Sequence, residues 1–186
     1  MKMKSSVSQL VFCALMIALG FVLMYVGLSI IPAAPFLKLE ISFIPVLILA
    51  KVLDVKYALL AAFCINMLDF FFKGTVTGLP IDQMINFIAM AIFLLTTVYF
   101  NKKGNKLGTI ISVAIITVMM VVINYFVTVP WYMGLAGIEL PKDYLSYIVS
   151  VYGTFNLIKW GIVGIFCYLE NLQIKNLIQK AKNFIR

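Results

Sequence analysis

The stretch LVFCALMIALGFVLMYVGLSII, residues 10–31, decides the fold class of this chain. It contains no charged residue, and its 22 positions are enough for an α-helix to cross the hydrocarbon core of a bilayer, which takes about 20. Only Lys2 and Lys4 precede it, as in a signal peptide, but the apolar run is too long for one and no cleavage site of small residues follows. We therefore expect this stretch to stay in the protein as a transmembrane helix.

The rest of the chain repeats this pattern. Five further charge-poor runs are residues 39–53, 57–72, 83–100, 107–133 and 147–169. Six spans of about 20 residues occupy about 120 positions, which is roughly the number of apolar residues here. Of the 186 residues, 63% are apolar and 12% are charged. The sequence thus predicts an all-α integral membrane protein with six transmembrane helices in one domain, residues 1–186. The second and third runs are short, so the prediction is weakest there.

The composition excludes several functions. There is no histidine, which removes imidazole-based metal sites, nucleophile pairs and proton relays. There is no phosphate loop, so we expect no ATP hydrolysis by the chain itself. The three cysteines lie inside apolar runs without a pairwise motif and are expected to pack rather than to form disulfides or bind a metal. We expect neither an enzyme nor a metal protein.

The lysines and the single arginine predict the orientation. With six spans, eleven of the fifteen cations fall on one side and three on the other, while Lys159 lies within the bilayer. Because short cytoplasmic loops retain cations, both termini should be cytoplasmic in a bacterial cell membrane. The net charge of +8 then needs no nucleic acid to explain it. Residues 170–186 mix apolar residues with lysines, which suits either an interfacial helix or a frayed end.

Lys159 lies near the middle of the last run. A lysine there costs about 2.5 to 3.5 kcal/mol on insertion scales, so another group must satisfy it. Asn156 lies one helical turn away on the same face, and the two side chains can point into a substrate cavity that opens to the outside. The alternative is a lysine neutralised by Asp69 or reaching water.

Other polar residues lie in the third, fourth and fifth runs. Asp69 precedes Lys73 by four residues, so a local ion pair is as good an explanation for it as ligand contact. Asn66 and Asn86 each suit interhelical hydrogen bonds. Asn124 lies near a group of aromatic residues that suits either stacking on a planar ligand or an interfacial belt.

Two further features suggest contacts outside the helices. Residues 31–38 lie on the outer side but are almost wholly apolar, with two prolines, and can either pack at the interface or close as a lid, with Phe36 and Leu37 over a ligand and Glu40 at the rim. Ala14 and Ala18 form a small-residue face that lets another helix approach closely.

Three stretches carry a family resemblance. Residues 36–45 (FLKLEISFIP), 78–87 (GLPIDQMINF) and 153–160 (GTFNLIKW) resemble the riboflavin-specific S components of energy-coupling factor (ECF) vitamin transporters, and the match runs through nearly the whole chain. The family segment before the second span has the form Leu-Lys-x-Asp-x-Ser-Asp-Ile-Pro. Glu40 and Phe43 replace its two aspartates here, whereas Leu37, Lys38, Ser42, Ile44 and Pro45 still fit.

The resemblance implies the S-component fold and the high-affinity capture of extracellular riboflavin. Riboflavin is then a transported substrate, and no cofactor is expected. It also implies three partners, a membrane scaffold subunit and two ATP-binding-cassette ATPases, with Ala14 and Ala18 docking on the scaffold. In this family the S component is thought to topple within the membrane to carry its site inward.

The chemistry of riboflavin suggests which residues bind it. Asn124, Asn156 and Lys159 can serve the carbonyl and imide edge of the isoalloxazine ring. The ribityl hydroxyls can reach Glu40, Asp69 or the backbone near Thr75 to Gly78, while Phe36 and Leu37 close above. Two other functions stay open: an S component for thiamine or biotin, and a self-sufficient secondary transporter that uses Lys159 and Asp69 as a charge pathway.

Overall fold

The computed structural model describes residues 6–32, 34, 37–75, 78–102, 107–137, 139 and 142–173. In the described part the chain is helical apart from one two-stranded ribbon. The elements are α1 (Ser6–Tyr25), β1 (Leu28–Ser29), β2 (Lys38–Leu39), α2 (Phe43–Val52), α3 (Val55–Lys73), α4 (Ile81–Lys102), α5 (Gly108–Ile123), the π-helix η1 (Asn124–Thr128), α6 (Val129–Ala136), α7 (Tyr144–Tyr147), the π-helix η2 (Ile148–Gly153) and α8 (Thr154–Gln173). The tail beyond residue 173, expected as an interfacial helix or a frayed end, lies outside the described residues.

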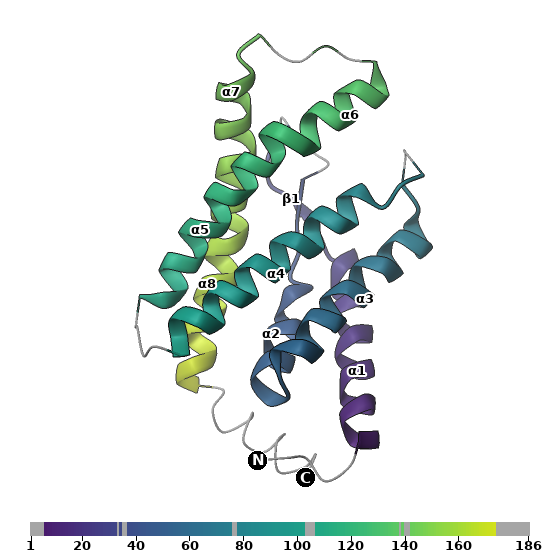
Figure 1. Ribbon diagram of the computed structural model, residues 1–186, viewed down its shortest axis with the longest axis vertical. Coiled ribbons are helices and arrows are strands. Elements are labelled where there is room, and N and C mark those ends of the chain that lie inside the picture. The colour runs from purple at the N-terminus through teal and green to yellow at the C-terminus, as the bar shows by residue number, and fades with distance from the viewer. Residues whose placement is uncertain are drawn as a thin grey trace.

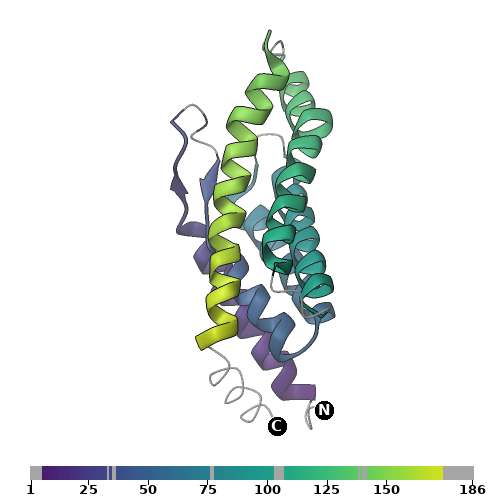
Figure 2. The same ribbon diagram turned by 90° about the vertical axis from the view of Figure 1, so that its left-hand side faces the viewer.

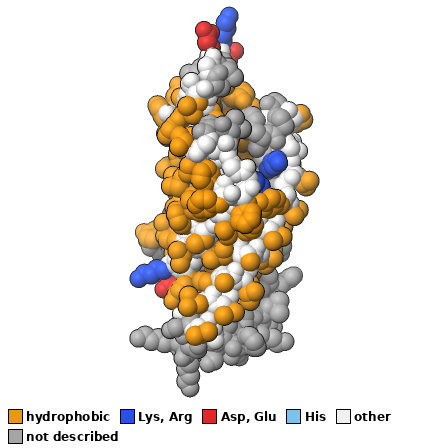
Figure 3. All heavy atoms as spheres, turned by 90° about the vertical axis from the view of Figure 1, so that its right-hand side faces the viewer, with side chains coloured by type: hydrophobic (Ala, Val, Ile, Leu, Met, Phe, Trp, Pro, Cys, Tyr) orange, Lys and Arg blue, Asp and Glu red, His pale blue; other side chains and the backbone are white. Residues whose placement is uncertain are grey.

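The helices suit a membrane. Five described segments are long and apolar enough to cross it: Val7–Tyr25, Val55–Lys73, Ile81–Asn101, Gly108–Leu135 and Tyr144–Tyr168. The fourth segment joins α5, η1 and α6 into one continuous span, and the fifth joins α7, η2 and α8 into another. Apolar side chains cover most of the face seen in Figure 3. The expectation of a multi-pass helical membrane protein is confirmed, while α2, with 10 residues, is shorter than the predicted second span.

A ribbon shortens the first two predicted spans. The helix that begins the chain ends at Tyr25 instead of continuing to residue 31, because the chain turns into β1, which pairs antiparallel with β2 through Leu28 and Leu39. Gly27 permits this turn, since a Cβ there would lie 3.1 Å from the Cβ of Lys38. α2 therefore begins only at Phe43, with Pro45 in its first turn, where proline is tolerated.

The spans form a bundle whose two ends differ. α1 begins and α8 ends at the same end, the lower end in Figure 1, where α2 and α4 also end. The ribbon lies in the upper half of the molecule beside α8 (Figure 2). α3 and α6 end toward the upper end, where α4 and α7 begin. This arrangement places the polar residues of the middle helices beneath the ribbon.

An aromatic layer crosses the middle of the bundle. Trp160 stacks on Phe93 with ring centroids 4.9 Å apart and meets Phe43 edge-on at 5.5 Å. All three side chains are at most 1% exposed. Because they come from α2, α4 and α8, the layer joins three helices.

Gly20 is a point of close helix contact, and its replacement by leucine should destabilise the protein. A Cβ at Gly20 would overlap Cδ1 of Ile65 and lie 3.2 Å from the carbonyl oxygen of Ser42. Overpacking of this kind costs about 1–3 kcal/mol, so we expect Gly20→Leu to lower the thermal unfolding temperature by several degrees in detergent. Gly161→Leu is the matched control, because nothing lies within 4 Å of a Cβ there. Equal unfolding temperatures for the two variants would contradict this packing.

Candidate functional site

A buried polar network lies above the aromatic layer. Lys159 Nζ donates to Glu40 Oε1 at 3.2 Å and to Asn86 Oδ1 at 3.1 Å. Asn86 Nδ2 donates to Glu40 Oε1 at 3.1 Å and to Asn66 Oδ1 at 2.9 Å. Lys159 and Glu40 are 8% and 9% exposed, so this ion pair is shielded from bulk water. The intramembrane lysine is therefore satisfied by a carboxylate and an amide from two other elements.

The partner of Lys159 differs from the one considered from the sequence. Asp69, proposed there as an alternative partner, forms an ion pair with Lys73 and accepts a hydrogen bond from Gln83 Nε2 at 3.1 Å. The expected local pair four residues apart is thus confirmed, and Glu40 takes the role proposed for Asp69. Interhelical hydrogen bonding, expected for Asn66 and for Asn86 individually, is found between the two side chains.

These polar groups line a cavity of about 220 Å³ between the ribbon and the helices. Its lining residues are Met24, Leu37, Lys38, Glu40, Asn66, Asp69, Lys73, Asp82, Gln83, Asn86, Phe155 and Lys159. Gln83 is 6% exposed, and its Oε1 has no hydrogen-bond partner among the described residues. The cavity therefore presents a cation, carboxylates and amides to anything that enters it.

Helical spacing explains how the residues converge. Asn66 and Asp69 are three residues apart on α3, as Gln83 and Asn86 are on α4, so each helix turns two polar side chains to one face. Glu40 follows β2 directly, and the ribbon carries it to Lys159. Sequence reasoning did not include the α4 pair in the candidate site, although its three-residue spacing repeats that of the α3 pair.

Several predicted site residues lie outside the cavity lining. Asn124 Nδ2 donates to the Met120 carbonyl at 2.6 Å, and Asn156 Nδ2 donates to the Tyr152 carbonyl at 2.8 Å, each within its own helix. Both asparagines are buried. The cavity and these two amides are thus distinct parts of the interior in this structure.

The remaining predicted residues have different surroundings. Thr75 Oγ1 donates to the Leu79 carbonyl at 2.8 Å, and Gly78 is exposed with a φ of 69°. Leu37 lines the cavity, whereas Phe36 lies outside the described residues. Ala14 and Ala18 are exposed on α1, which makes them accessible to another helix.

Two facing π-helical segments bound the upper part of the interior. π-helices are rare and are often found at functional sites. Ala34, from the segment between β1 and β2, is fully buried in an apolar cluster with Val129 of α6 and with Ile148 and Val151 of η2. Ile31, Ala34 and Leu37, from the segment expected either to pack or to close as a lid, thus pack against these spans, and Leu37 also lines the cavity.

The hydroxyl of Tyr144 is hydrogen-bonded to the η1 segment, and loss of this hydroxyl should destabilise the protein. It donates to the Tyr125 carbonyl at 2.7 Å, and the two rings lie 4.8 Å apart. One hydrogen bond contributes about 1 kcal/mol, so we expect Tyr144→Phe to lower the unfolding temperature by a few degrees. Tyr168→Phe, at a side chain that is 57% exposed, is the control. A Tyr144→Phe variant as stable as the parent would show that the bond contributes nothing.

The arrangement suits binding of a polar molecule. Among the described residues, no group of three or more His, Cys, Asp or Glu side chains could hold a metal ion. The fold and the cavity define the class: a multi-pass helical membrane protein with a polar cavity lined by its helices and the ribbon segment. The model of the ECF transporter substrate-specific component family matches residues 8–169, and the chain belongs to that family.

Known relatives agree with this membership. The chain is 30% identical over 179 residues to the riboflavin transporter RibU of Streptococcus thermophilus, covering 92% of this chain and 85% of that protein. It is 24% identical to the riboflavin transporter FmnP of Bacillus subtilis, covering 95% and 97%. A solved structure described as the S component of a bacterial ECF transporter is 26% identical, with a TM-score of 0.74 over 94% of this chain and 99% of that one. These relatives are transport proteins, not enzymes.

Proposed function

We propose that this chain is the riboflavin-binding S component of an ECF transporter and captures riboflavin from outside the cell. The observation that carries the proposal is the buried cluster of Lys159, Glu40 and Asn86 in the cavity. The chain belongs to the ECF substrate-specific component family, and its curated relatives are named riboflavin transporters. Within a membrane, such costly polar groups usually serve a pathway or a ligand.

Riboflavin matches the donors and acceptors of the cavity. Its pyrimidine edge carries two carbonyl acceptors and an imide N–H donor, and its ribityl chain carries hydroxyls. The Lys159 ammonium suits a carbonyl or a ring nitrogen, and Glu40 and Asp69 suit hydroxyl or imide donors. Gln83 Oε1, unpartnered among the described residues, offers one more acceptor. Hydrogen bonds to the ligand then offset the burial of these groups.

We expect the cavity to widen when riboflavin binds. Its volume of about 220 Å³ is below the 300–1,000 Å³ that is usual for small-molecule sites. The wall around Leu37 and Lys38 belongs to the ribbon rather than to a helix, so this wall is the one that moves most easily. Such movement is the lid role expected for residues 31–38, and it also offers a route by which Asn124, Asn156, Thr75 and Gly78 come into contact with the ligand.

We propose six membrane crossings: the five long apolar segments and one further crossing, second in the chain, that contains α2. Its 10 residues span about 15 Å, half of a 30 Å hydrocarbon core. Residues 39–41 precede it in non-helical conformation and add roughly 10 Å at about 3.3 Å per residue. Non-helical backbone is tolerated at membrane depth where it lines a cavity, and Glu40 of this segment does so. Six crossings and the distribution of cations give both termini a cytoplasmic location.

The energy for transport then comes from partners, a scaffold subunit and two ATPases, as the family implies. α1 is suited to contact the scaffold because most of its surface is not covered by the bundle. Only 17% of the residues in its apolar stretch are buried, against 44% in the apolar stretch of the last span. Ala14 and Ala18 lie exposed on this helix and permit a close helix contact.

The test of riboflavin binding is an absorption spectrum of the detergent-purified protein, followed by denaturation and identification of the released molecule. We expect about one flavin per chain. Riboflavin added to flavin-free protein should lose fluorescence and raise the unfolding temperature, whereas thiamine and biotin should do neither. A colourless protein stabilised by thiamine or biotin instead would contradict the riboflavin assignment but not the family. Gradient-driven uptake by the chain alone in liposomes would support a secondary transporter.

A further inference from the structure

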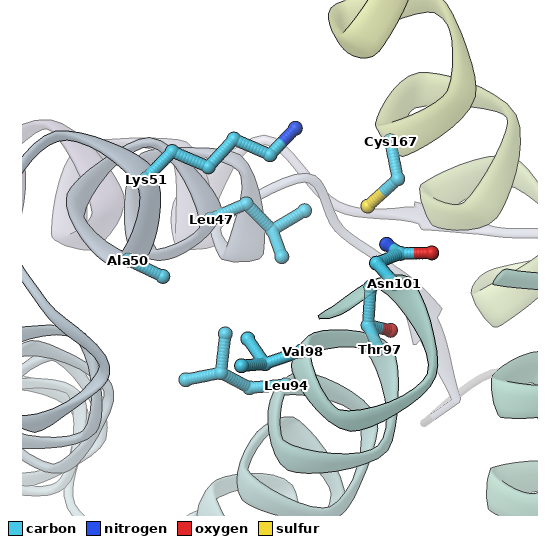
Figure 4. A pocket seen from close by; sticks show the side chains of 8 residues that line it. All are labelled: Leu47, Ala50, Lys51, Leu94, Thr97, Val98, Asn101 and Cys167. Carbon is cyan, nitrogen blue, oxygen red and sulfur yellow. The ribbon is translucent and has the colours of Figure 1, made fainter. Parts of the chain in front are cut away.

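A second hollow lies on the opposite side of the aromatic layer. Its volume is about 280 Å³, and its lining residues come from the ends of α2, α4 and α8 (Figure 4). The lining residues are Leu47, Ala50, Lys51, Leu94, Thr97, Val98, Asn101 and Cys167. None of them lines the cavity around Lys159. The hollow is therefore a separate site at the other end of the molecule.

One buried polar atom in this hollow lacks a partner. Thr97 is 5% exposed, and its Oγ1 forms no hydrogen bond among the described residues. Thr96, its neighbour in sequence, instead donates to the carbonyl of Ile92 within the helix at 2.7 Å. Most buried polar atoms in proteins are hydrogen-bonded, so the Thr97 hydroxyl indicates a ligand or ordered group in the hollow.

The other polar groups at this site can also donate hydrogen bonds. Thr97 and Asn101 lie four residues apart on one face of α4, and in Figure 4 the Asn101 amide nitrogen lies on the side of Cys167. The Lys51 side chain extends along the opposite wall. No carboxylate is among the described lining residues. An ammonium, an amide and a hydroxyl around one space form a donor set that suits an anion.

The surroundings identify the kind of anion. The remaining wall is made of apolar side chains, including Leu47, Leu94 and Val98. In the orientation proposed above, this end lies at the cytoplasmic leaflet, where anionic lipids gather and where basic pockets between transmembrane helices bind lipid headgroups. We propose that this hollow binds the phosphate of an anionic phospholipid, with Lys51, Thr97 and Asn101 as donors. The assignment of this hollow to the cytoplasmic leaflet rests on the proposed orientation of the protein, whereas the binding of the phosphate to these three donors does not.

The test uses the delipidated full chain in detergent and native mass spectrometry. Phosphatidylglycerol and phosphatidylcholine with identical acyl chains are added separately, and bound lipid is counted. We expect at least fivefold greater retention of phosphatidylglycerol, and a loss of at least fivefold in Lys51→Gln and Thr97→Val. Lys56→Gln is the matched control, because Lys56 is exposed at the same end and does not line the hollow. It should retain the lipid like the parent.

Three results would overturn the proposal. They are equal retention of the two lipids, an equal loss in Lys56→Gln, and full displacement of the lipid by soluble glycerol phosphate at the same concentration, which would indicate a site for a free anion. Riboflavin binding is measured on every variant. If a variant loses lipid retention but still binds riboflavin, the two sites are separate. If the parent itself does not bind riboflavin, the proposed function is refuted, and the lipid result is judged independently of it.

Discussion

Replacing Lys159 by methionine is expected to weaken riboflavin binding at least 100-fold, as measured by quenching of riboflavin fluorescence. The substitution removes a charged donor from the cavity and leaves Glu40 buried without its ion-pair partner. The unpaired carboxylate destabilises the fold, by about 3–5 kcal/mol. The affinity falls because the ligand loses a charged donor: truncating one partner of a buried charged contact costs about 2–5 kcal/mol of binding free energy, and about 2.8 kcal/mol corresponds to a 100-fold change in affinity. Lys142→Met, at an exposed lysine outside the cavity, should bind like the parent.

A double variant separates the loss of binding from the loss of folding. In Lys159→Met with Glu40→Gln, no buried charge is left unpaired, so the unfolding temperature should recover toward that of the parent. The ammonium donor is still missing, so riboflavin binding should stay weak. Tight binding by this double variant would show that the Lys159 side chain is not needed for the ligand.

Ala18→Trp is expected to reduce riboflavin uptake by more than tenfold in cells that hold the complete transporter. The indole would fill the close contact that two small residues permit on α1 and so prevent docking on the scaffold. Because Ala18 points away from the interior, riboflavin binding by the purified variant should stay within about twofold of the parent. Both measurements are needed, uptake in cells and binding by the isolated chain.

Ala114→Trp provides the matched control. Ala114 is also an exposed alanine on a transmembrane helix, but it lies on α5. Its variant should transport riboflavin like the parent. If both variants lost uptake equally, bulk on the lipid-facing surface would be the cause, and α1 would have no special role in docking.

The spans could be predicted from the sequence because the bilayer imposes a length and a polarity on each of them. The apolar runs identified five membrane-spanning segments in nearly their observed positions. The end of the first helix was wrong by six residues, because Val26 to Ile31 are as apolar as the helix before them. Only the pairing of Leu28 with Leu39 turns the chain into a ribbon, and no local pattern reveals that pairing.

The site was predicted less completely than the spans. Helical spacing reveals partners three or four residues away, which is why the pair of Asp69 and Lys73 was foreseen. The Glu40 partner of Lys159 is 119 residues distant, and its position depends on the ribbon. Likewise, the bonds of Asn124 and Asn156 to carbonyls of their own helices depend on rotamers that the sequence alone does not specify.

The ribbon directly connects α1, the helix proposed to dock on the scaffold, with Glu40 of the proposed riboflavin cavity. Only Val26 and Gly27 separate the end of α1 from β1, and Glu40 follows β2 directly. If closing the ribbon over riboflavin changes the affinity of α1 for the scaffold by some factor, docking on the scaffold must change riboflavin affinity by the same factor. The two affinities are therefore linked by a thermodynamic cycle. Release of the vitamin inside the cell then requires only a partner that prefers the open ribbon.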